Sequence, residues 1–176
     1  MVYFFSIPWH KNGLYLFKQL KLKAMKTMRT KKKLKIVIVE DNLYYNKALT
    51  HYLNTLCNSA VYPEFDFEIK SYLNAHDCIE ELEDDTNIMV LDYYLENDEE
   101  DDILTGADIV KAAKKHCDNC EIIMMSSQQN AHTTSELMRQ GVYDYIDKTV
   151  NTKDRLGAVL QKLLTKEFKE EQEELI

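Results

Sequence analysis

Residues 34–42 read Leu-Lys-Ile-Val-Ile-Val-Glu-Asp-Asn, and this stretch decides the fold. A short β-branched run that ends abruptly in polar residues is typical of a strand buried in a parallel sheet. Asn42 can cap the helix that the spacing of apolar residues predicts over 43–56. The folded part of the chain therefore begins with a strand and a helix, and two acidic side chains, Glu40 and Asp41, follow the strand.

The same alternation continues along the chain. Further strands are predicted at 65–72, 88–91, 121–125 and 142–146, and helices at 74–82, 105–117, 133–140 (closed by Gly141) and 152–169. Strands separated by helices pair in parallel, because only a crossover connects parallel neighbours. We therefore expect an α/β fold with a doubly wound, five-stranded parallel sheet. In such a sheet the functional site lies outside the carboxyl ends of the strands.

Composition points to a globular protein with an unevenly charged chain. The 176 residues suffice for one ordinary domain, with 45% hydrophobic and 30% charged residues. Residues 1–35 carry ten Lys or Arg and no acid, whereas residues 36–176 carry 12 basic and 30 acidic residues, a net charge of −18. Such an acidic body is a poor nucleic-acid surface. The basic segment is interpreted as a disordered extension or a non-native start, with nucleic-acid or acidic-membrane binding as the alternative.

The number of cysteines and the lengths of the apolar stretches indicate in which cellular compartment the protein is expected. Four Cys in this length are too few for a disulfide scaffold, which favours a reducing, cytoplasmic location. No apolar run is long enough for a membrane span. Cys117 and Cys120 have the spacing of a redox or zinc motif, but they follow a helix and lack two evident further ligands. We interpret them as structural.

Polar residues follow the predicted strands where the sheet would place a site. Glu40 and Asp41 follow the first strand, Asp92 the third, Ser126 the fourth and Lys148 the fifth. Neighbouring carboxylates repel one another and need a cation, and carboxylate oxygens suit Mg²⁺. Mg²⁺ with a lysine favours phosphoryl chemistry, in which a carboxylate can be the nucleophile. The sequence therefore predicts a magnesium-dependent phosphoryl site at this edge.

This pattern resembles the receiver domain of two-component response regulators. The residues that carry the resemblance are 36–42, 89–92, 122–127 and 141–148. The resemblance covers about residues 34–168, which leaves a basic N-terminal extension at 1–33 and an acidic C-terminal tail at 169–176. It implies a flavodoxin-like fold with strand order 2-1-3-4-5.

The resemblance also implies a role for each polar residue. Asp92 would be the phosphoacceptor, and Mg²⁺ (or Mn²⁺) would be held by Glu40, Asp41, Asp92 and the backbone carbonyl of Tyr94. The residues that bind the phosphoryl group or switch with it would be Ser126, Lys148 and Tyr145. A new charge on Asp92 would then bias one of two arrangements of the domain.

Three features depart from the family pattern. The loop after Asp92 is long and carries an acidic run at 96–102, which we interpret as solvated. Thr149 stands where the family usually has a proline after a cis bond, and a cis bond before a non-proline residue costs about 2.5–4 kcal/mol. Either Lys148 is therefore expected to sit differently, or the bond between Lys148 and Thr149 is expected to be strained. The third feature is the pair Tyr94 and Gln128, which occupy positions that in the family tune the rate at which the phosphoryl group is lost.

Too few residues follow residue 168 for a DNA-binding or enzymatic output, so we expect a stand-alone receiver. By the resemblance, it would accept a phosphoryl group from a histidine kinase or phosphotransfer protein. Its output would be a downstream protein or self-association through the fourth helix, fifth strand and fifth helix of the receiver, with no catalysis beyond slow self-dephosphorylation. A phosphorylation-independent scaffold and a DNA-associated regulator remain alternatives. A haloacid-dehalogenase-type enzyme is rejected, because Tyr94 stands where a second Asp would be the general acid.

Overall fold

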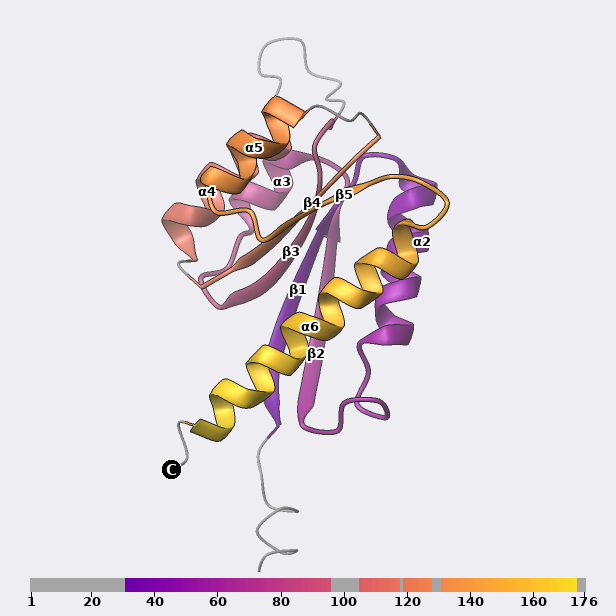
Figure 1. Ribbon diagram of the computed structural model, residues 1–176, viewed down its shortest axis with the longest axis vertical. Coiled ribbons are helices and arrows are strands. Elements are labelled where there is room, and N and C mark those ends of the chain that lie inside the picture. Colours follow the sequence, from indigo (N-terminus) through magenta and orange to yellow (C-terminus); the bar gives the residue numbers. More distant parts are fainter. Residues whose placement is uncertain (1–30, 96–104, 118, 128–130, 174–176) are drawn as a thin grey trace, which may run out of the picture. The chain divides into compact units, whose positions relative to one another are not determined.

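The computed structural model describes residues 31–95, 105–117, 119–127 and 131–173 (Figure 1). Its strands are β1 (Lys32–Val39), β2 (Phe65–Tyr72), β3 (Thr86–Asp92), β4 (Glu121–Ser126) and β5 (Asp144–Asp147). Its helices are α2 (Leu43–Leu56), α3 (Ala75–Glu80), α4 (Gly106–His116), α5 (Ala131–Arg139) and α6 (Thr152–Glu173). Most of the basic extension, the acidic loop 96–102, Gln128 and the last residues of the tail lie outside the described residues.

All five strands are parallel and lie in the order β2-β1-β3-β4-β5. The fold class and strand order predicted above are therefore confirmed. β1 begins at Lys32, earlier than expected, because Lys32 and Lys33 pair in register with β2. α6 continues beyond residue 169 to Glu173.

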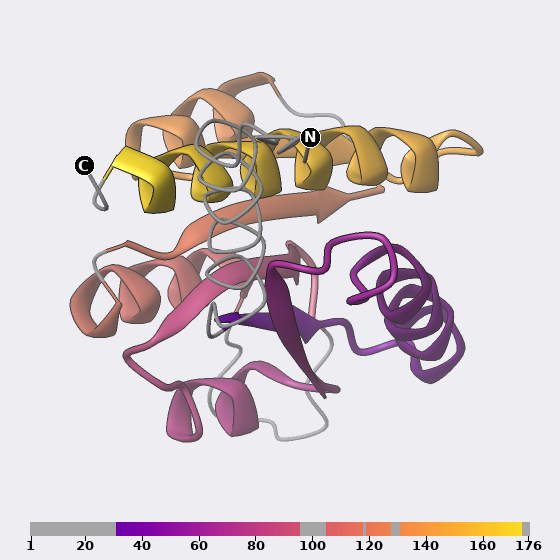
Figure 2. The same cartoon turned by 90° about the horizontal axis from the view of Figure 1, so that it is seen from below.

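Two hydrophobic cores cover the two faces of the sheet. Because side chains alternate along a strand, Ile36 and Ile38 face one core and Val37 and Val39 face the other. Residues of α2 and α6 close the first core, and residues of α3, α4 and α5 close the second. Figure 2 shows α2 on the other side of the strands from α3 and α4. This double layer buries the central strands on both faces, so their carboxyl ends form the accessible edge.

Local signals set the ends of the elements. The Asn42 side chain accepts hydrogen bonds from the amides of Tyr44 and Tyr45, as expected of an N-cap. Gly141 has a φ of 92°, which fits the C-cap predicted after α5. Within the described residues, no helix combines the length and the apolar character that crossing a membrane requires.

A cluster of ion pairs between β1, β2 and the segment before β3 leads to a pH prediction. Glu83 binds Lys35 and, at 2.5 Å, Lys70, and these hydrogen bonds lower its pKa from 4.5 to about 2. A carboxyl whose folded pKa lies below its unfolded pKa stabilises the fold when ionised, and this contribution is lost as pH falls through that interval. Glu83→Gln is therefore expected to be less stable than wild type at neutral pH, with the difference vanishing between about pH 4.5 and about pH 2.

Urea unfolding across this pH range measures the difference. Glu64→Gln is the control, since Glu64 lies outside the ion-pair cluster. A stability difference for Glu83→Gln that stays constant as pH falls would contradict the assignment.

Candidate functional site

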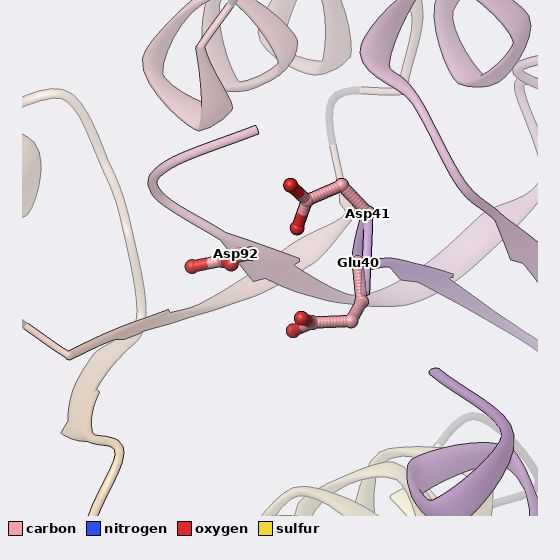
Figure 3. A group of neighbouring side chains, drawn as sticks. All are labelled: Glu40, Asp41 and Asp92. Atoms are coloured by element: carbon pink, nitrogen blue, oxygen red, sulfur yellow. The ribbon is translucent and has the colours of Figure 1, made fainter. Parts of the chain in front are cut away.

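Three carboxylates meet at the carboxyl ends of β1 and β3. The two strands are neighbours in the sheet, so the residues that follow β1 lie beside the last residue of β3. One ligand atom each from Glu40, Asp41 and Asp92 lies within 4.8 Å of the others. Figure 3 shows these side chains gathered at the strand ends. Glu40 is only 2% and Asp92 5% exposed, so two of the three acids are buried.

Lys148 joins this group from the end of β5. Its Nζ lies 2.6 Å from Asp92 Oδ2 and 2.7 Å from Glu40 Oε2. The described residues contain no cis peptide bond, so the bond between Lys148 and Thr149 is trans. A trans bond before Thr149 thus still lets the ammonium reach both carboxylates, and the strained cis bond considered above is absent.

Burial and hydrogen bonds act in opposite directions on the charged groups of this site. Burial raises the pKa of Asp92 and of Glu40, and the hydrogen bonds from Lys148 only partly oppose it. Burial lowers the pKa of Lys148, but its hydrogen bonds to Asp92 and Glu40 outweigh this effect and raise it overall. The Lys148 ammonium bridges the two buried carboxylates, and a third carboxylate, Asp41, stands beside them. Carboxylates this close to one another repel and favour a cation among them.

The residues present fit a divalent cation. Carboxylate oxygens are the donors that Mg²⁺ prefers, and Mg²⁺ usually takes one or two carboxylates together with waters. Glu40, Asp41 and Asp92 would hold it, and Asp41 is partly exposed, which leaves a way in from solvent.

The other predicted residues lie around this centre in different settings. Ser126 is fully buried at the end of β4, one position after Met125, which pairs with Asp92. The Tyr94 amide donates a long hydrogen bond of 3.4 Å to Asp92 Oδ1, and the Tyr94 side chain is 44% exposed. Tyr145 in β5 is half-buried and packs against the core under α3, α4 and α5. The fold thus brings all of these residues to the same edge or directly beneath it.

The two cysteines at 117 and 120 lie in that same core. Both are buried and form no disulfide bond within the described residues, and burial raises the pKa of Cys120 and, to about 12, that of the neighbouring Cys78. A buried thiol with a raised pKa is a poor nucleophile and a poor metal ligand. This setting agrees with the structural interpretation.

Sequence reasoning missed Asn46, which anchors the loop that carries the acidic pair. Asn46 is 4% exposed, and its Nδ2 donates to the carbonyls of Glu40 at 3.1 Å and Tyr72 at 2.8 Å. The Glu40 amide also donates to the Tyr72 carbonyl. Both peptide groups of Glu40 are therefore held at the ends of β1 and β2. An Asn in the first turns of a helix looks like an ordinary polar residue in sequence, so no local signal marks it.

Removing this anchor is expected to weaken cation binding. Asn46→Leu keeps the volume but loses both donors, and we expect the Mg²⁺ dissociation constant to rise by about 10-fold, as for other residues that orient metal ligands. Amide NMR shifts during a Mg²⁺ titration measure it. Asn54→Ala is the control, because Asn54 bonds to the carbonyl of Thr50 on the exposed side of the same helix. Equal Mg²⁺ affinity in both variants would show that Asn46 does not position the acids.

Comparison with known proteins agrees with this geometry. The sequence pattern of the response regulator receiver domain matches residues 36–161. The fold is similar to a BeF₃-activated DrrB receiver domain (TM-score 0.61, 20% identity, 76% of this chain and 98% of that chain). It is also similar to a CheY-like receiver domain protein from Methanospirillum hungatei (TM-score 0.57, 21% identity, 80% and 99%). No curated protein matches the chain.

Proposed function

Because the chain belongs to the response regulator receiver family, we propose that Asp92 accepts a phosphoryl group from a histidine kinase or a phosphotransfer protein in two-component signalling. The observation that carries this proposal is the meeting of Glu40, Asp41, Asp92 and Lys148 at one edge of the sheet. A divalent cation together with an ammonium beside one carboxylate suits phosphoryl transfer.

In the proposed reaction, an oxygen of the Asp92 carboxylate forms a bond to phosphorus while the bond between phosphorus and the donor's histidine nitrogen breaks. That nitrogen keeps the electron pair. Lys148 lies 2.6 Å from Asp92 Oδ2, so its ammonium can neutralise charge on the transferring group. Bound Mg²⁺ would supply further positive charge to the phosphoryl oxygens. Phosphoryl acceptance and slow hydrolysis of the product are the only chemistry that we propose for the chain.

The output would be a change in a partner-binding surface. A phosphorylated Asp92 carries additional negative charge and acceptor oxygens, for which Lys148 and Ser126 are the nearby donors. Both adjoin β4 and β5, since the Lys148 amide donates to the Ser126 carbonyl at 2.7 Å. We propose that the change reaches α5, β5 and α6 through these strands and Tyr145. A cytoplasmic location accords with four buried cysteines, none of which forms a disulfide bond in the described structure.

Intact-mass spectrometry tests this function. The protein is incubated with acetyl phosphate or phosphoramidate, with Mg²⁺ or with a chelator. We expect the mass of one phosphoryl group to be added only when Mg²⁺ is present. No gain with either donor or with a cognate kinase would contradict phosphoryl acceptance and favour the phosphorylation-independent scaffold.

A further inference from the structure

The turn between β5 and α6 holds the peptide groups on both sides of Lys148 through one hydroxyl. Thr152 Oγ1 accepts a hydrogen bond from the Thr149 amide at 2.6 Å. The same hydroxyl shares its proton between two acceptors, the Thr149 carbonyl at 2.7 Å and the Asp147 carbonyl at 3.1 Å. Thr152 is only 3% exposed, so these bonds are shielded from competing water.

This set of hydrogen bonds between Thr152 and both Asp147 and Thr149, which we call the clasp, depends on the residue that follows Lys148. A proline at that position would have no N–H to donate. Thr149 retains its N–H in a trans peptide and gives it to Thr152. Side-chain hydroxyls of Thr commonly close such turns by bonding to nearby backbone groups. The backbone on either side of Lys148 is thus fixed by hydrogen bonds that this sequence makes itself.

The other end of the lysine side chain rests on Tyr45. The Lys148 ammonium lies 4.8 Å from the centre of the Tyr45 ring, within the range of a cation–π interaction. Tyr45 comes from α2, is half-buried, and has its phenol within hydrogen-bonding reach of the Thr152 side chain. Tyr45 and Lys148 also line an open groove of about 460 Å³ with Glu40, Asn42, Tyr44 and Ser127.

From these contacts we infer that Thr152 and Tyr45 are positioning residues for Lys148. Thr152 fixes the backbone from which the lysine extends, and Tyr45 supports the ammonium beside Asp92. The inference rests on the proposed function, because it concerns the lysine that would meet the transferred phosphoryl group. Neither residue contacts the Asp92 carboxylate in the described hydrogen bonds, so both act through Lys148.

Two pairs of variants test the inference in the full chain. Thr152→Val keeps the shape and removes the hydroxyl, and Thr165→Val is the matched control, since Thr165 bonds to the Gln161 carbonyl on the exposed side of α6. Tyr45→Leu removes the ring, and Tyr45→Phe keeps it. The measured quantity is the rate constant of phosphoryl uptake from phosphoramidate.

We expect Thr152→Val to slow uptake by about 10-fold, because small misplacements of a reacting group are costly. We expect about 5-fold for Tyr45→Leu, the size of a partly desolvated cation–π contact. Thr165→Val should stay near wild type, and Tyr45→Phe should be slowed less than Tyr45→Leu, because it keeps the ring that faces the Lys148 ammonium. Mg²⁺ affinity should change less than about 2-fold in all four, since none removes a carboxylate or the Asn46 hydrogen bonds that hold Glu40. In a Lys148→Ala background, Thr152→Val and Tyr45→Leu should cause no further slowing.

A slowing by Thr152→Val that persists in full without Lys148 would overturn the inference, because it would reveal a general structural effect. Uptake at the wild-type rate in both Thr152→Val and Tyr45→Leu would do the same while leaving the proposed function intact. Hydrogen exchange of the Thr149 amide measures its hydrogen bond to Thr152 independently of phosphorylation. Exchange of this amide should be slow in wild type and at least about 10-fold faster in Thr152→Val. If wild type takes up no phosphoryl group while its Thr149 amide is protected, the proposed function and the role assigned to Lys148 are rejected. The hydrogen bonds of Thr152 to the backbone around Lys148 would still stand.

Discussion

Asp92→Asn is expected to abolish phosphoryl uptake from small donors and from a kinase, because an amide nitrogen or oxygen cannot replace the nucleophilic carboxylate. The fold should survive the change. Burial raises the pKa of Asp92 above its usual value, so its ionisation costs folding free energy as pH rises through that pKa. Removing this charge should leave the protein at least as stable at neutral pH, with Lys148 still paired to Glu40 at 2.7 Å.

Intact mass after incubation with phosphoramidate and Mg²⁺ measures uptake, and thermal unfolding measures stability. Asp66→Asn is the matched control, since Asp66 is exposed on the edge strand β2. Its uptake should equal that of wild type. Undiminished labelling of Asp92→Asn would place the phosphoryl group on another residue and overturn the assignment of the acceptor.

Gly106→Ala is expected to destabilise the protein by about 3 kcal/mol, at the upper end for overpacking by one methyl group. A Cβ at Gly106 would lie 2.4 Å from the backbone carbonyl oxygen of Asp92 and 3.0 Å from the Cα of Tyr93. Backbone atoms cannot swing aside as side chains can. Either α4 or the end of β3 must therefore move, and Asp92 would move with it. Phosphoryl uptake should fall in the same variant.

Gly157→Ala in α6 is the matched control. Its Cβ would lie 2.4 Å from the hydroxyl of Tyr52, the mobile end of a side chain. Turning that ring would lose the hydrogen bond to the Lys153 carbonyl, worth about 1 kcal/mol, while alanine gains about 1 kcal/mol of helix propensity. We expect a change near zero in the free energy of unfolding. Urea unfolding measures the free energy of unfolding of both variants. Equal losses of stability would show that the close approach of Gly106 to the Asp92 backbone costs no more than that of Gly157 to the Tyr52 side chain.

Most of the fold was predictable because its signals are local. The apolar run at 34–39 followed by Glu40, Asp41 and Asn42 needs no partner to mark a buried strand and a capped helix. Ends were less certain. β1 begins earlier than the apolar run, because Lys32 and Lys33 pair with β2, and their side chains also bind Glu167 and Glu68, which are distant in sequence.

The convergence of the acids with Lys148 could be predicted in outline, because parallel strands end at the same edge of a sheet. Its details could not be. The sequence alone does not say that the lysine bridges Glu40 and Asp92, 108 and 56 positions away. Nor does it mark Asn46 or Thr152, whose roles come from hydrogen bonds to backbone groups in other segments.

The sequence by itself therefore determined the alternation of strands and helices, the parallel sheet and the edge at which the polar residues stand. Tertiary structure alone decided which atoms meet there: the lysine between two buried carboxylates, the Tyr45 ring beneath it, and the backbone of α4 pressed against Asp92 at Gly106. The physical reason is the distance along the chain over which each interaction acts. Hydrophobic periodicity and capping act within a few residues, whereas hydrogen bonds and close packing depend on distances between segments that exist only once the chain is folded.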